Sequence, residues 1–385
     1  MAIIKLTYFM NYFIKNIHIN KLFHLENIDI PIANEKYPHL IITGKNGSGK
    51  TVLLNAIVDY FRFNKQRFLP DPNYSVIIEF VKHYGEKPYK FFNNNLDVKD
   101  FVVAYYSADR KVKMSEPKYP TKPVFRYKSI EDSASSQFLN FLSDLKIQEA
   151  LARNEKQFDD ADEINAWFAD FEKLLQQIFQ DEALKLEFNY KDYSFKICTE
   201  GKRFKFTELS DGFAAALDIV ADLILKMQDK DSLTRAYEKE GIVLIDEIET
   251  HLHLGLQKVI MPLLTKVFPN IQFIVTTHSP FVLSSMPNAV AYDLEHREVL
   301  DDLTEYSYES LAEGYFGVKT QSSYAEMQLN TLKELLGKEV WTEADKVEIK
   351  QLKSDFEKIP ETISPLIVGE FRQIVIQNAE KLKNL

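Results

Sequence analysis

The chain has a single cysteine, no long hydrophobic run, and fewer basic than acidic side chains. One cysteine cannot form a disulfide within the chain, and this fits a reducing cytoplasm. No run of 18 apolar residues is present, so no membrane-spanning helix is expected. Asn11 interrupts the apolar segment 6–14, which we therefore interpret as a strand and not as a signal peptide. A net charge of −10 does not favour tight nucleic-acid binding, although it leaves room for a local basic patch.

A glycine-rich loop lies near the start of the chain. Residues 44–51 read GKNGSGKT and match G-x-x-x-x-G-K-[ST]. The apolar residues 40–42 predict a buried strand before the loop, and those at 52–61 recur at helical spacing after it. Glycines allow the backbone N–H groups to turn around a phosphate, and the start of the helix adds positive charge. The residues expected to bind ATP are Gly44, Lys45, Asn46, Gly47, Ser48, Gly49, Lys50 and Thr51, with Lys50 at the β and γ phosphates and Thr51 at Mg²⁺.

A second motif is a pair of carboxylates at the end of an apolar run. Residues 241–245 predict a central parallel strand that is buried on both faces. Asp246 and Glu247 follow it, where open α/β sheets bind their ligands. We expect Asp246 to hold Mg²⁺ and Glu247 to orient or deprotonate the attacking water.

Two further segments are of interest, one around His278 and one around Ser210. Residues 272–276 predict a strand that ends just before His278.

The second segment begins with Phe204 and Phe206, whose alternation predicts the end of a strand. A helix is expected from Gly212 to residue 226, with Ser210 as its N-cap. Since Ser210 and Gly212 have little bulk, a phosphate has room to approach this helix start.

The order of these motifs resembles the ATP-binding cassette class. Residues 209–213, LSDGF, lie between the glycine-rich loop and the acidic strand end, and DEIETHLH resembles the SMC-like and OLD-like branch. The resemblance implies a homodimer that sandwiches two ATP molecules, with a higher oligomer left open. Each ATP would contact Lys50 of one copy and Ser210 of the other. It also places His278 at the γ-phosphate, and Glu249 and His253 along the dimer seam.

The resemblance also implies a loop that carries a glutamine, and two segments of this chain are candidates for it. The strand predicted at 101–106 is followed by residues 107–110, which contain no glutamine. Gln137, at the start of the next helices, is the other candidate, and the sequence does not decide between them. Arg110 is placed to reach a phosphate or, equally well, to form a surface salt bridge.

The expected fold is α/β: an ATP-binding cassette head with a parallel or mixed sheet, an inserted helical lid and a helical C-terminal region. Residues 1–130 form the first lobe of the core, 131–182 the lid with two helices, and 183–298 the rest of the core. We expect a hairpin after the lid, and a last strand at 290–294. Residues 299–385 form a helical region that lacks a catalytic constellation and is suited to docking a partner.

The segments FTELSDG, GIVLIDEIETHLH and FIVTTHSPFVL resemble the stand-alone ATPases of bacterial anti-phage systems of the Septu, PARIS and retron-associated type. This resemblance implies an ATPase that regulates a separate effector, a nuclease or toxin encoded nearby. One alternative is an SMC-like or RecF-like DNA-repair ATPase that clamps DNA. A scaffold that binds ATP without appreciable hydrolysis is another. A transporter subunit is disfavoured because Ile248, and not proline, follows Glu247.

Overall fold

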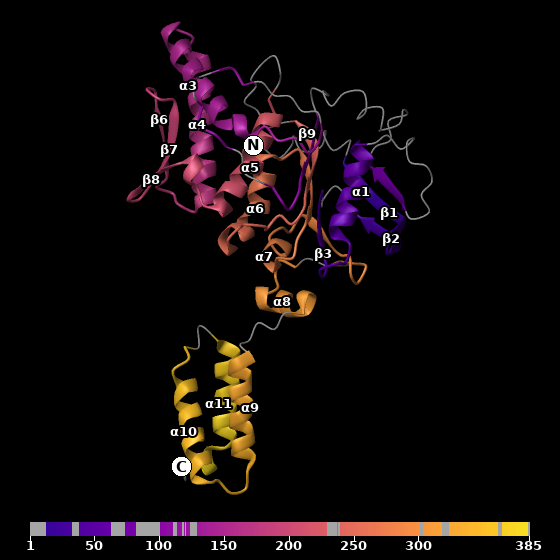
Figure 1. Cartoon of the computed structure of the whole chain (residues 1–385), viewed down its shortest axis with the longest axis vertical. Coiled ribbons are helices and arrows are strands. Elements are labelled where there is room, and N and C mark those ends of the chain that lie inside the picture. Colours follow the sequence, from indigo (N-terminus) through magenta and orange to yellow (C-terminus); the bar gives the residue numbers. More distant parts are fainter. Residues whose placement is uncertain are drawn as a thin grey trace, which may run out of the picture. The chain divides into compact units, whose positions relative to one another are not determined.

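The computed structural model describes residues 13–32, 38–62, 74–81, 101–110, 114–117, 119, 121–123, 129–228, 237, 239–300, 303–317, 323–360 and 364–383. Its contacts divide the chain into two compact units, Met1–Tyr308 and Glu309–Leu385 (Figure 1). Most of the strand expected at 6–14 falls outside the described residues. No helix in the described part is both long and apolar enough to cross a membrane.

The first unit is built on a six-stranded mixed sheet. Its strand order is β12-β11-β3-β10-β9-β5, and only β12 runs antiparallel to its neighbour. The core strands are apolar and buried, as the sequence predicts. The bounds are β3 His39–Thr43, β5 Phe101–Tyr106, β9 Glu240–Ile245, β10 Ile271–Thr276, β11 Ala289–Asp293 and β12 Glu298–Leu300. The carboxyl ends of β3, β5, β9 and β10 therefore meet at one edge, which gathers the glycine-rich loop, the acidic strand end and the segment that carries His278.

A second, antiparallel sheet packs near the first helix. It has the order β2-β1-β4, with β1 Ile14–Leu22, β2 Leu25–Pro31 and β4 Tyr74–Phe80. Helix α1, Lys50–Arg62, contributes Leu53, Leu54 and Ile57 to a core shared with both sheets. Figure 1 shows α1 beside β1 and β2. The predicted strand, loop and helix around the glycine-rich loop are confirmed.

The helical insert has the two helices that the sequence predicts, followed by a small sheet. Helices α3 Phe138–Asn154 and α4 Phe158–Phe179 pack through aromatic rings, with the Phe138 and Phe171 centroids 5.5 Å apart. Strands β6 Lys185–Asn189, β7 Ser194–Thr199 and β8 Lys202–Lys205 form the antiparallel sheet, and a short helix precedes α3 at Ser135–Gln137. The prediction of a strand through Phe206 is wrong, because Phe206 begins a short helix, Phe206–Glu208, in which Glu208 accepts from the Lys205 N–H.

Helix α5, Asp211–Lys226, follows and is tied to the strand β5 by a buried carboxylate. Asp222 is fully buried and accepts from the Tyr106 hydroxyl at 2.7 Å and the Ala134 N–H at 2.6 Å. Lys226 pairs with the same carboxylate at 2.6 Å. The start of the insert and helix α5 are thus held to the end of β5.

The end of the first unit differs from the prediction. Helices α6 Leu254–Val267 and α7 Pro280–Leu283 lead to β11, which the sequence indicated as the last strand. That prediction is wrong, because β12 pairs back onto β11. Asp293 accepts from the Glu295 and His296 N–H groups and so turns the chain through the two strands.

The second unit is helical, and its core is the leucine stripe that the sequence predicts. Leu329, Leu332, Leu335 and Leu336 of one helix are buried together with Phe356 and Phe371 of the next two, whose rings stack at 5.2 Å. The helices are α9 Ser323–Gly337, α10 Glu343–Glu357, α11 Pro365–Gln377 and α12 Ala379–Leu382, with α8 Tyr308–Phe316 at the boundary between the units.

The buried ring of His39 is expected to make the stability of the fold depend on pH. Its ring is 4% exposed, its Nδ1 accepts from the Phe273 N–H at 3.2 Å, and burial lowers its pKa to about 4. Between this value and the ordinary pKa near 6.5, the unfolded chain binds a proton that the folded chain excludes. The free energy of unfolding therefore falls as the pH drops through this window, by about 3 kcal/mol from this residue.

Urea unfolding at pH 7.5 and pH 4.5 tests this prediction, with His39→Gln as the comparison. The variant lacks the titrating ring, so the wild-type advantage seen at pH 7.5 is expected to shrink markedly at pH 4.5. An advantage of equal size at both pH values would show that His39 does not titrate as expected.

Candidate functional site

The glycine-rich loop follows β3 and has the backbone that its sequence requires. Gly44, Gly47 and Gly49 all have positive φ, at 134°, 85° and 101°. A Cβ on Gly44 would lie 2.9 Å from the Ser48 Oγ, and one on Gly49 would lie 3.0 Å from Leu25. The loop therefore closes tightly only with glycine at these positions, and it packs against the hairpin between β1 and β2.

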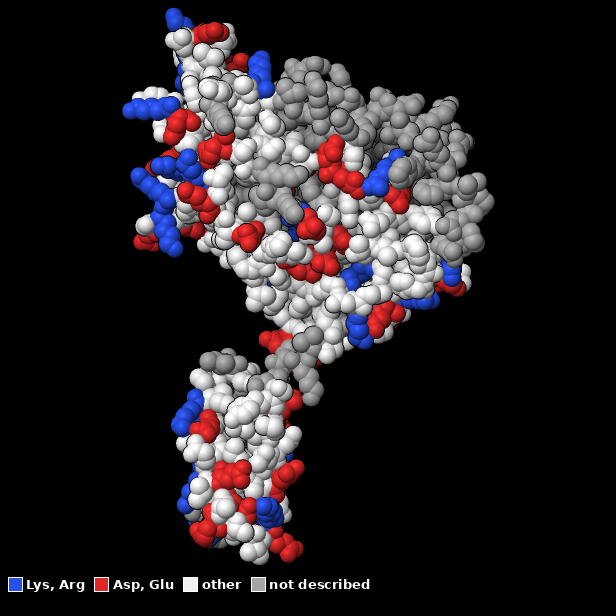
Figure 2. All heavy atoms as spheres, in the orientation of Figure 1, with Lys and Arg blue, Asp and Glu red and all other residues white. Residues whose placement is uncertain are grey.

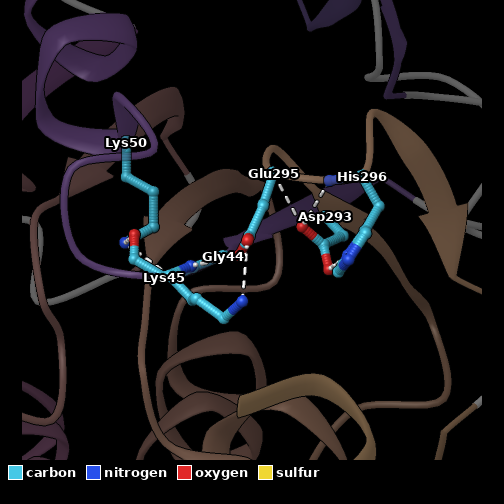
Figure 3. Close-up of polar contacts among 6 residues, drawn as sticks. All are labelled: Gly44, Lys45, Lys50, Asp293, Glu295 and His296. Atoms are coloured by element: carbon cyan, nitrogen blue, oxygen red, sulfur yellow. Dashed lines mark hydrogen bonds and ion pairs between the residues drawn. The ribbon is translucent and has the colours of Figure 1, made fainter. Parts of the chain in front are cut away.

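Lys50 at the start of α1 is folded back onto the loop. Its Nζ donates to the Gly44 carbonyl at 2.8 Å and to the Lys45 carbonyl at 3.0 Å, and the residue is buried (Figure 3). Burial lowers the pKa of Lys50, and the carboxylates of Glu247 and Glu249 act in the opposite direction. The ammonium group is thus held at the loop, where its charge is available to an anion.

A corner after β11 also contacts the loop, which the sequence did not indicate. The Glu295 carboxylate accepts from the Lys45 Nζ at 2.9 Å and from the Lys45 N–H at 3.3 Å (Figure 3). Asp293 fixes this corner through the Glu295 and His296 N–H groups. No local pattern identifies Glu295, because the two partners lie 250 residues apart.

The residues present fit a magnesium nucleotide. The Thr51 hydroxyl lies 3.3 Å from the Asp246 Oδ1, which brings together the two kinds of oxygen that Mg²⁺ prefers. The Ser48 Oγ is buried and has no hydrogen-bond partner within the described part of the chain. Together with the glycine backbone and the Lys50 ammonium, these groups suit a phosphate and its metal ion.

The acidic strand end is joined to the next strand by a threonine. Asp246 is 3% exposed, and its Oδ1 accepts from the Thr276 hydroxyl at 2.6 Å. The Glu247 N–H donates to the same hydroxyl oxygen at 2.8 Å. Thr276 ends the apolar β10, so a polar residue at that strand end was the signal that sequence reasoning missed. Glu247 itself has a left-handed backbone, with φ of 44°.

Glu249 connects this acidic turn, residues 246–250, to His278. Its Oε2 accepts from the Thr277 hydroxyl at 2.8 Å, and its Oε1 from the His278 N–H at 2.5 Å. The pKa of His278 is lowered by burial and, secondly, by the charge of Lys50, which favours the neutral ring. Within its own chain, the Glu249 carboxylate thus connects the acidic turn to the segment that carries His278, and its place along a dimer seam stays a prediction.

The serine-glycine turn, residues 209–213, packs against the stretch after the acidic turn. Ser210 is the exposed N-cap of α5, and its side chain makes no capping hydrogen bond. A Cβ on Gly212 would lie 2.7 Å from the His251 carbonyl oxygen. His253 caps α6 by accepting from the Leu256 N–H, and its ring meets Phe213 edge-on at 5.1 Å. Among the described residues, no hydrogen bond joins Ser210 or Gly212 to the glycine-rich loop.

The two candidates for the glutamine loop lie in different places. Gln137 is exposed and ends the short helix before α3. Residues 107–110 follow β5, and Arg110 from this segment donates to the Asp246 carbonyl at 3.2 Å and the Ile248 carbonyl at 2.9 Å. Arg110 thus contacts the acidic turn, which neither expectation for this residue had foreseen.

Parts of this chain are similar to known proteins. The Septu protein PtuA of Bacillus mycoides (strain KBAB4) is 27% identical over 319 residues, which cover 74% of this chain and 41% of the relative. The "Retron Ec83 probable ATPase" of Escherichia coli is 48% identical over 77 residues, 20% of this chain and 14% of the relative. The chain thus spans less than half the length of these curated relatives.

Among solved structures, the SMC head bound to the C-winged helix domain of ScpA covers 76% of this chain and 95% of its own, with 16% identity and a TM-score of 0.41.

The family model described as "AAA domain, putative AbiEii toxin, Type IV TA system" matches residues 72–284. This is more than half of the chain, and it includes the serine-glycine turn, the acidic strand end and His278. The expected relationship to Septu and retron ATPases is confirmed. The chain therefore belongs to this family of P-loop ATPase domains.

Proposed function

We propose that the protein hydrolyses ATP with Mg²⁺ in the cytoplasm, and that its nucleotide state controls a separate effector protein in anti-phage defence. The observation that carries the enzymatic part is the link between the two halves of the site. Thr51 of the loop and Thr276 of β10 both donate to one Asp246 oxygen, at 3.3 and 2.6 Å. The loop and the acidic turn are thus held as one site.

Within this proposal each group has a defined task. The loop residues 44–51 bind the phosphates, Lys50 balances their charge, and Thr51 and Asp246 hold the metal ion. Glu247 takes a proton from the attacking water, and His278 contacts the terminal phosphate. A bound metal ion would supply charge neutralisation at the phosphates.

The dimer is the second part of the proposal. Ser210 is exposed and its hydroxyl has no capping bond, so it is free to contact a nucleotide held by another copy. Two copies related by a twofold axis would each contribute Ser210 and Gly212 to the site of the other. The close approach of Gly212 to the His251 carbonyl fits this arrangement, because it holds the serine-glycine turn in place next to the residues that follow the acidic turn.

For the effector we propose a nuclease or toxin that docks on the second unit. This unit exposes apolar side chains on several helices, among them Val347 at 68% and Ile376 at 74%. Large exposed apolar residues are typical of binding surfaces when they gather. The relatives are a Septu protein and a retron ATPase, and both names come from defence systems.

The test is co-purification of the full chain with the product of a neighbouring gene. Glu247→Gln with ATP represents the loaded state, and Lys50→Ala the empty state. A switch requires unequal affinity for the two, and we expect at least about a tenfold difference in Kd. Ile376→Asp should weaken the complex, whereas Tyr190→Asp, equally exposed on the turn between β6 and β7, should not. Equal affinity in both states, or no association together with no protection from phage, would contradict the proposal.

The DNA-clamp alternative depends on positive charge. Figure 2 shows basic side chains along β6–β8, where Lys185, Lys202 and Arg203 are exposed. Two of these already form ion pairs, Lys185 with Glu172 at 3.0 Å and Arg203 with Glu187 at 3.3 Å. ATP-stimulated, salt-sensitive binding of duplex DNA would nevertheless favour the clamp over effector control.

A further inference from the structure

The contacts of Arg110 are accounted for neither by the sequence motifs nor by the proposed function. It follows β5, whose last residue Tyr106 pairs with Ile245 of β9, so that residues 107–110 lie beside the acidic turn. Resting on the proposed ATPase activity, we propose that Arg110 is a positioning residue that fixes the backbone at Glu247 for hydrolysis.

The guanidinium group faces a row of main-chain carbonyls. Its two terminal nitrogens donate to Asp246 at 3.2 Å, Ile248 at 2.9 Å and Ser107 at 3.3 Å. Longer contacts of 3.4 Å reach the Glu247 and Thr250 carbonyls. Four of these five carbonyls belong to the acidic turn, so one side chain gathers nearly the whole turn on one side.

The opposite side of the same peptides is held by β10. The peptide group before Glu247 has its carbonyl on Arg110 and its N–H on the Thr276 hydroxyl at 2.8 Å. The peptide group after Glu247 has its carbonyl on Arg110 and its N–H on the Thr276 carbonyl at 3.2 Å. Because each peptide group is planar and rigid, pinning both ends of both groups fixes φ and ψ of the residue between them.

This clamp, meaning the contacts of Arg110 and Thr276 on the two sides of the acidic turn, holds Glu247 in an unfavourable backbone conformation. A residue with a Cβ avoids the left-handed region, and Glu247 has φ of 44°. Without the carbonyl contacts, the turn would relax toward an ordinary backbone and the Glu247 carboxylate would move away from its partner, the Thr250 hydroxyl at 3.3 Å. Displacement of a catalytic group by about 1 Å reduces rates by about 10²-fold.

Arginine suits this position better than lysine. Its planar fork presents several N–H donors in fixed directions, whereas an ammonium group is a point charge that cannot span successive carbonyls. Burial lowers the pKa of Arg110, the Glu249 and Asp218 carboxylates raise it, and the group stays charged at neutral pH.

The test compares Arg110→Lys and Arg110→Gln with Arg153→Lys and Arg153→Gln. Arg153 also donates to oxygens, those of Glu149 and Asp162, but it lies in the helical insert. In both Arg110 variants kcat should fall by about 10²-fold while the Kd for ATP changes by less than about threefold. Both Arg153 variants should match the wild type. Hydrogen exchange of nucleotide-free protein should show faster exchange at the amides of 247 and 248 in the Arg110 variants alone.

The outcomes separate this inference from the proposed function. Wild-type kcat in Arg110→Lys would show that charge suffices, and unchanged exchange at 247 and 248 would show that the clamp is absent; either result overturns the inference. If the wild-type protein hydrolyses no ATP, the proposed function fails, and the exchange measurement alone decides whether Arg110 fixes the turn. Arg110→Lys keeps the charge, so it serves as the deciding variant should Arg110→Gln fail to fold.

Discussion

Glu247→Gln is expected to bind ATP with wild-type affinity and to hydrolyse it about 10²- to 10⁴-fold more slowly. Glutamine has the same shape as glutamate and keeps an oxygen that can accept from the Thr250 hydroxyl, which lies 3.3 Å from the carboxylate. It cannot take a proton from water. The left-handed backbone and the contacts of the Glu247 N–H should therefore survive while the chemical step is lost.

Steady-state turnover and ATP titration measure the two quantities separately. Lys50→Ala should weaken ATP binding itself, because it removes the buried ammonium group from the loop. Glu187→Gln, an exposed glutamate on β6, serves as the matched control and should behave as wild type. Hydrolysis by Glu247→Gln at the wild-type rate would mean that another group activates the water.

Ser210→Arg is expected to abolish hydrolysis without affecting ATP binding by the isolated chain. The physical reason is steric, since arginine at an exposed helix start would fill the space that a phosphate bound by the other copy requires. A mixture with Lys50→Ala then provides a sharper test than either variant alone. The Ser210→Arg copy supplies an intact loop, and the Lys50→Ala copy supplies an intact serine-glycine turn.

Random pairing of equal amounts makes half of the dimers mixed, and each mixed dimer has one intact site of two. The mixture should therefore recover about a quarter of the wild-type activity. Tagging the two variants differently establishes that mixed dimers form. No recovery in a mixture with demonstrated mixed dimers would count against a site shared between copies.

The parts of the site that the sequence predicted are those in which the local sequence determines the local structure. Residues 40–57 contain a buried strand, a glycine-dependent loop and an amphipathic helix, and each is a local pattern. The same holds for residues 241–247. Local propensity and hydrophobic periodicity were sufficient there, because the strand and the helix have distinct repeats.

The parts that sequence did not predict are bonds between distant segments. Thr276 holds Asp246, Arg110 holds the acidic turn, and Glu295 reaches Lys45. In each case the order of the strands in the sheet decides which distant residues come into contact. A single sequence does not reveal that order. The unexpected strand β12 has the same origin, since its pairing with β11 depends on a turn that Asp293 closes.

The position of β3 in the middle of the sheet also determines how late in synthesis this strand can pair with its neighbours. Its neighbours β10 and β11 come much later in the chain, and the buried Gln272 side chain bonds the Pro38 carbonyl across 234 residues. At roughly 5–20 residues per second, β3 waits on the order of ten to fifty seconds for either neighbour to be synthesised. During that interval both of its edges are unpaired, a state prone to misassociation, and loop-closure entropy opposes the eventual pairing. Early packing of α1 with the antiparallel sheet would cover the face of β3 that carries Leu40 and Ile42, whereas the two edges of the strand gain their partners only when synthesis passes β11.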